Sequence, residues 1–321
     1  MRSPVAILLL VLPGIAAPDV LAQSYPVRAI KLVVPSSPGG GTDIVGRILA
    51  QKLSEQIGQQ MVVDNRAGAG TVIGNDAVAK SAPDGYTLLM GLSTLAINPS
   101  MFAKLPYDAL RDFAPISQAV SAPNILTVHP SVPAKTVKEF IALAKSKPGS
   151  ITFGSAGQGT SPHLSGELLK VLAGIDIVHV PFKGSGQSVI SLLAGEIGAN
   201  FASLPTAMSY IKAGRLRGLG VTTLKRAQAL PDVPSIAEGG VPGYEATQWF
   251  GLLAPAGTPR PIIDRLYQES SRALRSADVK ERMTAEGLEV VGGTPEEFAS
   301  YIRSETDKWT KVIKAAGIKP Q

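Results

Sequence analysis

"KLVVPSSPGGGTDIVGRILAQKL", residues 31–53, has three consecutive glycines between an apolar run and an amphipathic repeat. A short, continuous apolar run is typical of a buried parallel strand. From Ile44 onward the apolar residues follow helical spacing; Thr42 or Asp43 can cap the start of this helix, and Gly58 can end it. Glycines in such a turn leave backbone N–H groups open to an anion, and the helix start adds partial positive charge. The stretch therefore indicates an anion-binding turn, or a turn required only for tight packing.

The glycines do not match either nucleotide-binding pattern. A dinucleotide fingerprint needs glycine three residues after Gly41, where this chain has Ile44. The spacing of Gly41 and Gly46 matches the two glycines of a Walker motif. However, Arg47 and Ile48 follow, where the motif requires lysine and then serine or threonine. Neither class of nucleotide site is predicted.

Strand, small-residue loop and helix recur along the chain, over residues 60–91 and again over 150–203. Strand-helix-strand order requires parallel strands, so the pattern predicts an α/β protein of two lobes, each with a mostly parallel sheet. Ligands of such sheets bind at the carboxyl ends of the strands. We therefore expect a cleft with "PSSPGGGTD", residues 35–43, on one lip and "GSAGQGTS", residues 154–161, on the other.

Composition excludes several function classes. The chain has 321 residues, of which 45% are hydrophobic and 17% charged, as expected for a compact globular protein. The absence of cysteine excludes thiol catalysis, disulfides and cysteine metal sites. The net charge of +6 could favour acidic ligands or serve solubility alone. Scattered basic residues and 5% aromatics argue against a nucleic-acid partner.

The first 22 residues have the pattern of a secretory signal: Arg2, an apolar core over residues 5–12, and Val20-Leu21-Ala22 as a small-residue cleavage site. The eight apolar residues are too few to span a bilayer, which takes roughly 20. We expect cleavage after Ala22 and export of the mature chain to the periplasm.

No pattern for catalysis or a resident cofactor stands out. His129, His163 and His179 have no companion histidine or acidic cluster at metal-ligand spacing, so no metal site is predicted. The G-x-S-x-G turn of serine hydrolases is also absent. We predict a binding protein without cofactor; the enzyme alternative is a periplasmic hydrolase or isomerase that uses His163.

Motifs along the whole mature chain, among them "SPGGGTDIVGRILAQKL", "DNRAGAGTVIGNDAVAKSAPDGYTLLMG", "TFGSAGQGTSPHLSGELL", "VHVPFKGSG" and "ALPDVPSIAEGGVPGYEATQWFGLLAPAGTP", resemble the Bug family. These are extracytoplasmic solute receptors of tripartite tricarboxylate transporters. The resemblance implies a two-lobed, type II periplasmic-binding-protein fold, with residues 24–124 and 246–321 in lobe I and 125–245 in lobe II. It also implies a monomer that captures a small organic acid, a carboxylate, and delivers it to integral membrane permease subunits; a sensory receptor is the alternative.

The resemblance also implies the ligand-binding residues, carried over by motif position. They form two lips and two further cleft positions: Pro38, Gly39, Gly40, Gly41, Thr42, Asp43, Ser93, Ser155, Ala156, Gly157, Gln158, Gly159, Thr160, Ser161 and Ser203. Two departures stand out: Ser36 and Ser37 replace a usual aromatic residue, and Ser203 stands where many members have an acid. Without that acid a ligand amino group lacks its partner, which favours a plain carboxylate over an amino acid.

Overall fold

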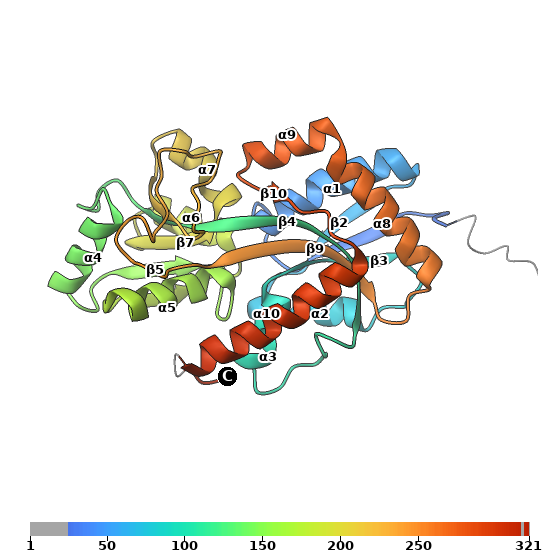
Figure 1. Ribbon diagram of the computed structural model, residues 1–321, viewed down its shortest axis with the longest axis horizontal. Helices are drawn as coiled ribbons and strands as arrows, with labels where there is room; N and C mark the ends of the chain where they lie inside the picture. Colours follow the sequence, from blue (N-terminus) through green and yellow to red (C-terminus); the bar gives the residue numbers. More distant parts are fainter. Residues whose placement is uncertain (1–24, 316–317, 321) are drawn as a thin grey trace, which may run out of the picture.

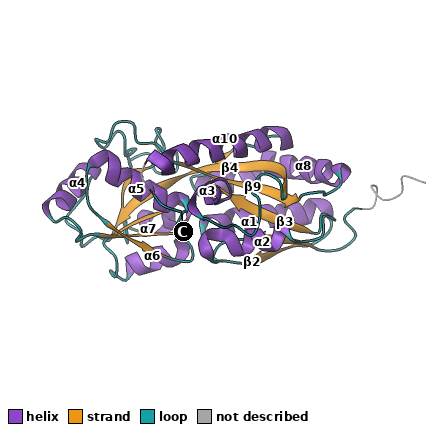
Figure 2. Cartoon of the chain, turned by 90° about the horizontal axis from the view of Figure 1, so that it is seen from below, coloured by secondary structure: helices purple, strands orange, loops and turns teal. Residues whose placement is uncertain are grey.

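The computed structural model describes residues 25–315 and 318–320. The predicted signal segment and its cleavage after Ala22 lie outside the described residues. The chain forms an elongated α/β molecule with two groups of strands side by side (Figure 1). In Figure 2 the strands run through the middle of the molecule and helices lie outside them.

Lobe I, as the term is used here, contains the first group of strands and their helices. Its strands are β1 (Ile30–Val34), β2 (Met61–Asn65), β3 (Thr87–Leu92), β9 (Thr247–Pro255), β10 (Glu289–Val290) and the first part of β4 (Phe113–Val128). Its helices are α1 (Gly41–Ile57), the short 3-10 turn η1 (Ala69–Thr71), α2 (Val72–Ala79), α3 (Thr94–Met101), α8 (Arg260–Arg275), α9 (Ala277–Ala285) and α10 (Pro295–Ala315).

Helices cover both faces of the lobe I sheet, which explains the continuous apolar run of β1. Leu32 and Val34 pack into a core with α1, α8 and α9, whereas Val33 points to a second core with α2, α3 and α10. Side chains of a strand alternate between the two faces, so residues 32–34, which are buried on both faces, are all apolar, while Lys31 near the start of β1 is exposed. β1 pairs in parallel with β2 and β3, and its carboxyl end therefore delivers the glycine turn to the same edge as theirs.

Lobe II contains the second group. Its strands are β5 (Thr152–Ser155), β6 (Val178–Pro181), β7 (Ala199–Ser203) and β8 (Arg217–Val221), together with the second part of β4. Its helices are α4 (Val137–Ser146), α5 (Ser161–Ala173), α6 (Ser185–Leu193) and α7 (Leu204–Lys212). One core joins the sheet to α4 and α5, and another joins it to α6 and α7. The two lobes thus have separate hydrophobic cores on a common sheet.

The long strand β4 passes through both lobes. It pairs antiparallel with β9 as far as Pro123, and from Asn124 onward it pairs antiparallel with β7. The sheets are therefore mixed: β1 to β3 and β5 to β7 are parallel as predicted, while β4 and β9 run against their neighbours. The change of partner supports a lobe boundary near residue 124, although the limits 124/125 and 245/246 remain a prediction.

The glycine-rich turn of the opening stretch forms a strand-to-helix connection at the predicted place. Gly58 ends α1 in the left-handed conformation with φ 72°, as predicted. The predicted start of α1 was wrong by two to three residues: the N-cap is Gly40, and not Thr42 or Asp43. A glycine can cap without a side chain, so the first N–H groups of α1 receive no side-chain hydrogen bond at the cap.

No helix within residues 25–315 combines the length and the apolar character needed to cross a membrane.

Candidate functional site

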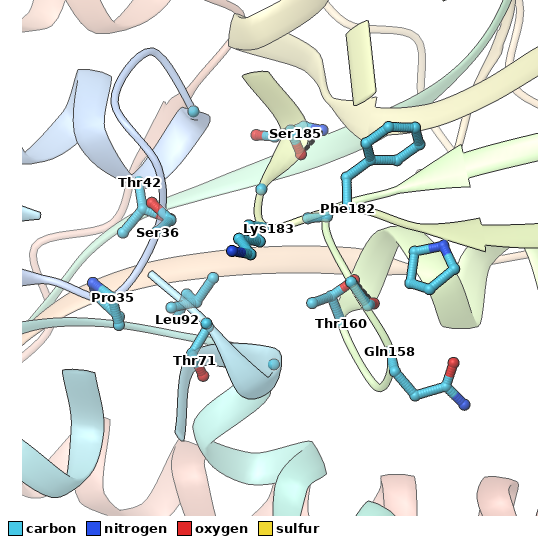
Figure 3. Close-up of a pocket in the computed structure, with 18 of the residues that line it drawn as sticks. Pro35, Ser36, Thr42, Thr71, Leu92, Gln158, Thr160, Phe182, Lys183 and Ser185 are labelled. Carbon is cyan, nitrogen blue, oxygen red and sulfur yellow. Dashed lines mark hydrogen bonds between the residues drawn. The ribbon is translucent and has the colours of Figure 1, made fainter. Parts of the chain in front are cut away.

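A cavity of about 370 Å³ lies between the lobes, at the carboxyl ends of the parallel strands (Figure 3). Its walls come from the turns that follow β1, β2, β5 and β6, from the last residues of β3, β6 and β7, from β9, and from Phe102 after α3. The lining residues are Pro35, Ser36, Gly40, Gly41, Thr42, Gly68, Ala69, Gly70, Thr71, Leu92, Phe102, Ala156, Gly157, Gln158, Thr160, Pro181, Phe182, Lys183, Gly184, Ser185, Ser203 and Gln248.

The structure separates the residues of the two predicted lips into those that line the cavity and those that lie behind it. Eight line it: Gly40, Gly41, Thr42, Ala156, Gly157, Gln158, Thr160 and Ser203. Seven do not: Pro38, Gly39, Asp43, Ser93, Ser155, Gly159 and Ser161. Several of the second set hold the first set in place, and all of them remain predictions as ligand contacts.

Helix starts converge on the cavity from both lobes. Gly40 is the N-cap of α1, Thr160 of α5, Gly184 of α6 and Ser203 of α7, and all four residues line the cavity. The first N–H groups of each helix have no acceptor within the helix, and the helix dipole adds partial positive charge there. No aspartate or glutamate is among the described lining residues. The cavity is therefore suited to a negatively charged group.

Asp43 shapes the first lip from behind. Its carboxylate accepts hydrogen bonds from the Gly39 N–H and from Arg47 Nε, both at 2.9 Å, and from Asn65 Nδ2 at 2.9 Å. Burial by itself would raise the pKa of Asp43, but these three hydrogen bonds outweigh it and hold the pKa below its ordinary value. The carboxylate is thus ionised and fully occupied, and it fixes the backbone turn at Gly39, where φ is +76°.

Two stacked histidines support the second lip. Ser155 Oγ accepts a hydrogen bond from the Gly157 N–H at 3.0 Å and lies 2.7 Å from His179 Nε2. The Gly159 N–H donates to His163 Nδ1 at 3.1 Å, so the proton of the neutral His163 ring is on Nε2. The two rings stack with centroids 4.0 Å apart. Burial and, to a lesser extent, the charge of Lys170 lower the pKa of His163 to about 4.

The contact between Ser155 and His179 resembles a nucleophile and its base, but its surroundings argue for a supporting role. Ser155 is fully buried and does not line the cavity, so a bound molecule would not reach its Oγ. Burial, followed by neighbouring His163 and Lys170, lowers the pKa of His179 to about 3. Within the described part of the chain, no group of three or more metal-ligating side chains occurs.

Lining residues absent from the predicted site come mainly from two further turns. Residues 68–71 follow β2, and residues 181–185 run from the last residue of β6 to the first residue of α6. Both turns have the glycine pattern recognised in the sequence, so the same signal could have included them. Ala69 and Thr71 have positive φ, 46° and 80°, and no other non-glycine residue of the described chain does. Such strain is frequently concentrated at functional sites.

Three polar atoms in the cavity wall lack a partner within the described protein. They are Ser36 Oγ, Ser203 Oγ and Gln248 Oε1, and all are buried. Buried polar atoms are nearly always paired, so these three mark a part of the cavity wall where the protein leaves polar groups unsatisfied. Leu92, Phe102 and Gln248 reach the cavity through tertiary packing, and no local sequence pattern identifies them.

The lips touch across the cavity mouth, and glycines make these contacts possible. A Cβ at Gly41 would collide with Ser203, and a Cβ at Gly184 would collide with Ser37. A Cβ at Gly186 would lie 3.1 Å from the Pro38 carbonyl oxygen, which is tighter than ordinary contact. The two lobes are therefore closed on the cavity.

Two lobes closed on an interlobe cavity are typical of a solute-binding protein. The chain matches the family described as "Tripartite tricarboxylate transporter family receptor" over residues 45–318 and belongs to it. It is 40% identical to protein BugT of Bordetella pertussis, with 95% of this chain and 94% of BugT covered. The predicted Bug-family membership is confirmed.

Solved structures agree with this assignment. A Rhodopseudomonas palustris protein solved with adipate is 37% identical with a TM-score of 0.90, and the match covers 92% of this chain and all of that one. MatC of R. palustris, solved with bound malate, is 32% identical with a TM-score of 0.84, with 90% of this chain and all of MatC covered. The predicted periplasmic-binding-protein fold is confirmed, and the protein is a solute-binding receptor.

Because the pKa of His163 is lower in the folded chain, the stability of the protein should depend on pH. Its pKa is about 4 in the folded chain and 6.5 ordinarily, so the unfolded chain binds more protons between these values. The free energy of unfolding should therefore fall as pH falls through this window, by on the order of 1–3 kcal/mol for this group. His163→Asn keeps an acceptor for the Gly159 N–H and should reduce the loss, as measured by urea unfolding at pH 7 and pH 4.

His129→Asn, at the end of β4, is the matched control and should keep the wild-type pH dependence. The same loss of stability in wild type and His163→Asn would contradict this account of the second lip.

Proposed function

We propose that the cleft captures a small carboxylic acid without changing it chemically and that the closed receptor delivers this acid to the membrane subunits of a tripartite transporter. The observation that carries the proposal is a cavity without acidic side chains on which the starts of α1, α5, α6 and α7 converge. A carboxylate placed there receives backbone hydrogen bonds from helix starts, which is a common arrangement for anions.

The relatives support the chemical class of the ligand. Adipate and malate, the molecules in two similar structures, are both carboxylic acids. Ser203, which lines the cavity, offers a hydroxyl and no charge, so a ligand amino group would find no carboxylate partner in the wall. Plain carboxylic acids are therefore favoured over amino acids.

We further propose that the chain is exported and cleaved after Ala22, and that it acts in the periplasm as a monomer. We also propose that the boundaries between its two lobes lie near residues 124 and 246. The fifteen residues carried over from the family are proposed as the ligand-binding site. Those that line the cavity would contact the acid, and Asp43, Ser155 and Gly159 would position the lips that do so.

The proposal is tested on the chain from Gln23 to Gln321 by comparing how carboxylates and their neutral amides stabilise it. Thermal unfolding would be measured with mono-, di- and tricarboxylates, amino acids and nucleotides, each acid beside its amide of nearly the same shape. A bound acid at 100 times its dissociation constant should add about 2.7 kcal/mol to the free energy of unfolding. The amide should add little, because it lacks the charge that the helix starts stabilise.

Stabilisation by at least one acid and not by its amide would support the proposal. Equal stabilisation by acid and amide, or stabilisation by nucleotides alone, would contradict it. Any acid that binds would be re-isolated after incubation with the protein. Its conversion to a product would support the enzyme alternative.

Gly41→Ala tests the role of lip closure in capture. The added Cβ collides with Ser203 across the cavity, so the lobes can accept it only by opening. Affinity for the bound acid, measured by calorimetry, should fall by more than about tenfold, which is 1.4 kcal/mol. Gly293→Ala is the matched control, because its Cβ would meet only ordinary contacts at 3.6 Å or more. Unchanged affinity in Gly41→Ala would show that closure against Ser203 is not needed.

A further inference from the structure

The turn formed by residues 68–71 is held in a strained conformation at the wall of the cavity. All four of its residues line the cavity, and Figure 3 shows Thr71 among them. Ala69 has a φ of 46° and Thr71 a φ of 80°, in the left-handed region that residues with a Cβ rarely adopt. Such a conformation persists only where the surrounding structure fixes it. The turn therefore depends on the groups that pack behind it.

The same turn is also a place where lobe I meets the second lip of lobe II. A Cβ at Gly70 would lie 2.7 Å from the carbonyl oxygen of Gln158, so the two backbones are in close contact. Next to Gln158 in the chain, Gly159 packs on Met101 of α3, where a Cβ would lie 3.1 Å from the methionine side chain. A shift of the turn would therefore change both the cavity wall and the fit of the closed lobes.

A buried polar network behind the turn holds it at two points. The Gly70 carbonyl oxygen accepts a hydrogen bond from Asn98 Nδ2 at 3.1 Å. Thr71 Oγ1 accepts one from Asn75 Nδ2 at 3.3 Å and lies 2.7 Å from Thr94 Oγ1. The side chains of Asn75, Thr94 and Asn98 are fully buried, so bulk water does not reach them. Both the backbone and a side chain of the turn are thus held from inside lobe I.

Tyr107 joins the two asparagines of this network. Its hydroxyl oxygen accepts hydrogen bonds from Asn75 Nδ2 at 3.0 Å and from Asn98 Nδ2 at 3.1 Å. Asn75 belongs to α2 and Asn98 to α3, so this one hydroxyl links the two helices behind the turn. The ring of Tyr107 is buried and packs edge-on against Phe113, with centroids 5.6 Å apart. Tyr107 itself does not line the cavity.

We propose that Tyr107 is a positioning residue for ligand capture: through Asn75 and Asn98 it holds the strained turn in the conformation that completes the cavity and meets the second lip. The inference rests on the proposed function and adds to it a residue that lies behind the cavity wall. Without the hydroxyl, two buried amide groups lose an acceptor, and the turn can leave the left-handed region. Only a fraction of the molecules then has a competent cavity, and the apparent affinity falls in proportion to that fraction.

Tyr107→Phe tests the inference, because it removes the hydroxyl and keeps the ring against Phe113. Affinities for acetate, malate, adipate and citrate would be measured by calorimetry. Binding rates would be followed by stopped-flow tryptophan fluorescence, since Trp249 is next to the cavity-lining Gln248. Any acid that binds wild type should bind the variant about tenfold more weakly. The association rate should carry this loss and the dissociation rate should stay within about twofold, because the contacts of the bound acid do not change.

Tyr25→Phe is the matched control. Tyr25 packs on the core of lobe I, and its hydroxyl donates to the Gly85 carbonyl oxygen at 2.6 Å; neither residue lines the cavity. This variant loses a hydrogen bond of the same lobe and should keep the wild-type affinity. Thr94→Val, which removes the hydroxyl beside Thr71 Oγ1, should lower the association rate in the same direction as Tyr107→Phe.

Hydrogen exchange tests the turn without any ligand. The Thr71 N–H donates to the Gly68 carbonyl oxygen at 3.0 Å. It should exchange with solvent more than about tenfold faster in Tyr107→Phe than in Tyr25→Phe, because the turn opens locally.

Equal affinities of Tyr107→Phe and Tyr25→Phe would overturn the inference, with or without a change in exchange, and would leave the proposed function standing. A weaker affinity that comes from faster dissociation, with unchanged exchange at Thr71, would also overturn it. If none of the acids in the thermal screen binds wild type, the inference and the proposed function are both wrong.

Discussion

The N–H groups in the first turn of an α-helix have no acceptor within that helix, and the cleft depends on this constraint. The parallel strands of both lobes end at the cavity, so α1, α5, α6 and α7 begin there. Gly40 and Gly184 start α1 and α6 without side-chain capping, which leaves their N–H groups available. The same order of elements that builds the two cores therefore also builds an anion site between them.

The glycines of the opening stretch have three different functions. Gly39 adopts a positive φ, and its N–H is held by Asp43. Gly40 caps α1, and Gly41 allows Ser203 of the opposite lobe to come close. A side chain at any one of them would alter the turn, the cap or the closure of the lobes.

The cleft carries features that reduce stability and are best explained by ligand binding. Ala69 and Thr71 are in a backbone region that costs about 1–2 kcal/mol for residues with a side chain. Ser36 Oγ and Ser203 Oγ are buried without a partner in the described protein. At the start of α10, by contrast, Thr294 and Glu297 satisfy each other: the Thr294 N–H donates to Glu297 Oε2 and the Glu297 N–H donates to Thr294 Oγ1. Backbone strain and unpaired polar groups are frequently concentrated at functional sites, and here both belong to residues that line the cavity.

The sequence predicted those features that are determined by residues close together in the chain. The apolar run of β1, the helical spacing of α1 and the left-handed Gly58 all follow from neighbouring residues. The stacking of His163 on His179 could not be predicted, because it depends on how α5 packs beside β6. Leu92 and Gln248 reach the cavity only because the sheet brings β3 next to β9.

The most direct test of the account is an amide NMR measurement on the mature, deuterated protein. The acid with the largest stabilising effect would be titrated while the backbone N–H signals are followed. The account predicts the largest downfield proton shifts at Gly41 and Thr42 in lobe I and at Ser185 in lobe II, because those N–H groups would donate to the carboxylate. Unchanged signals at all three, with shifts confined to a second groove, which lies between residues 223–228 and α9, would contradict it.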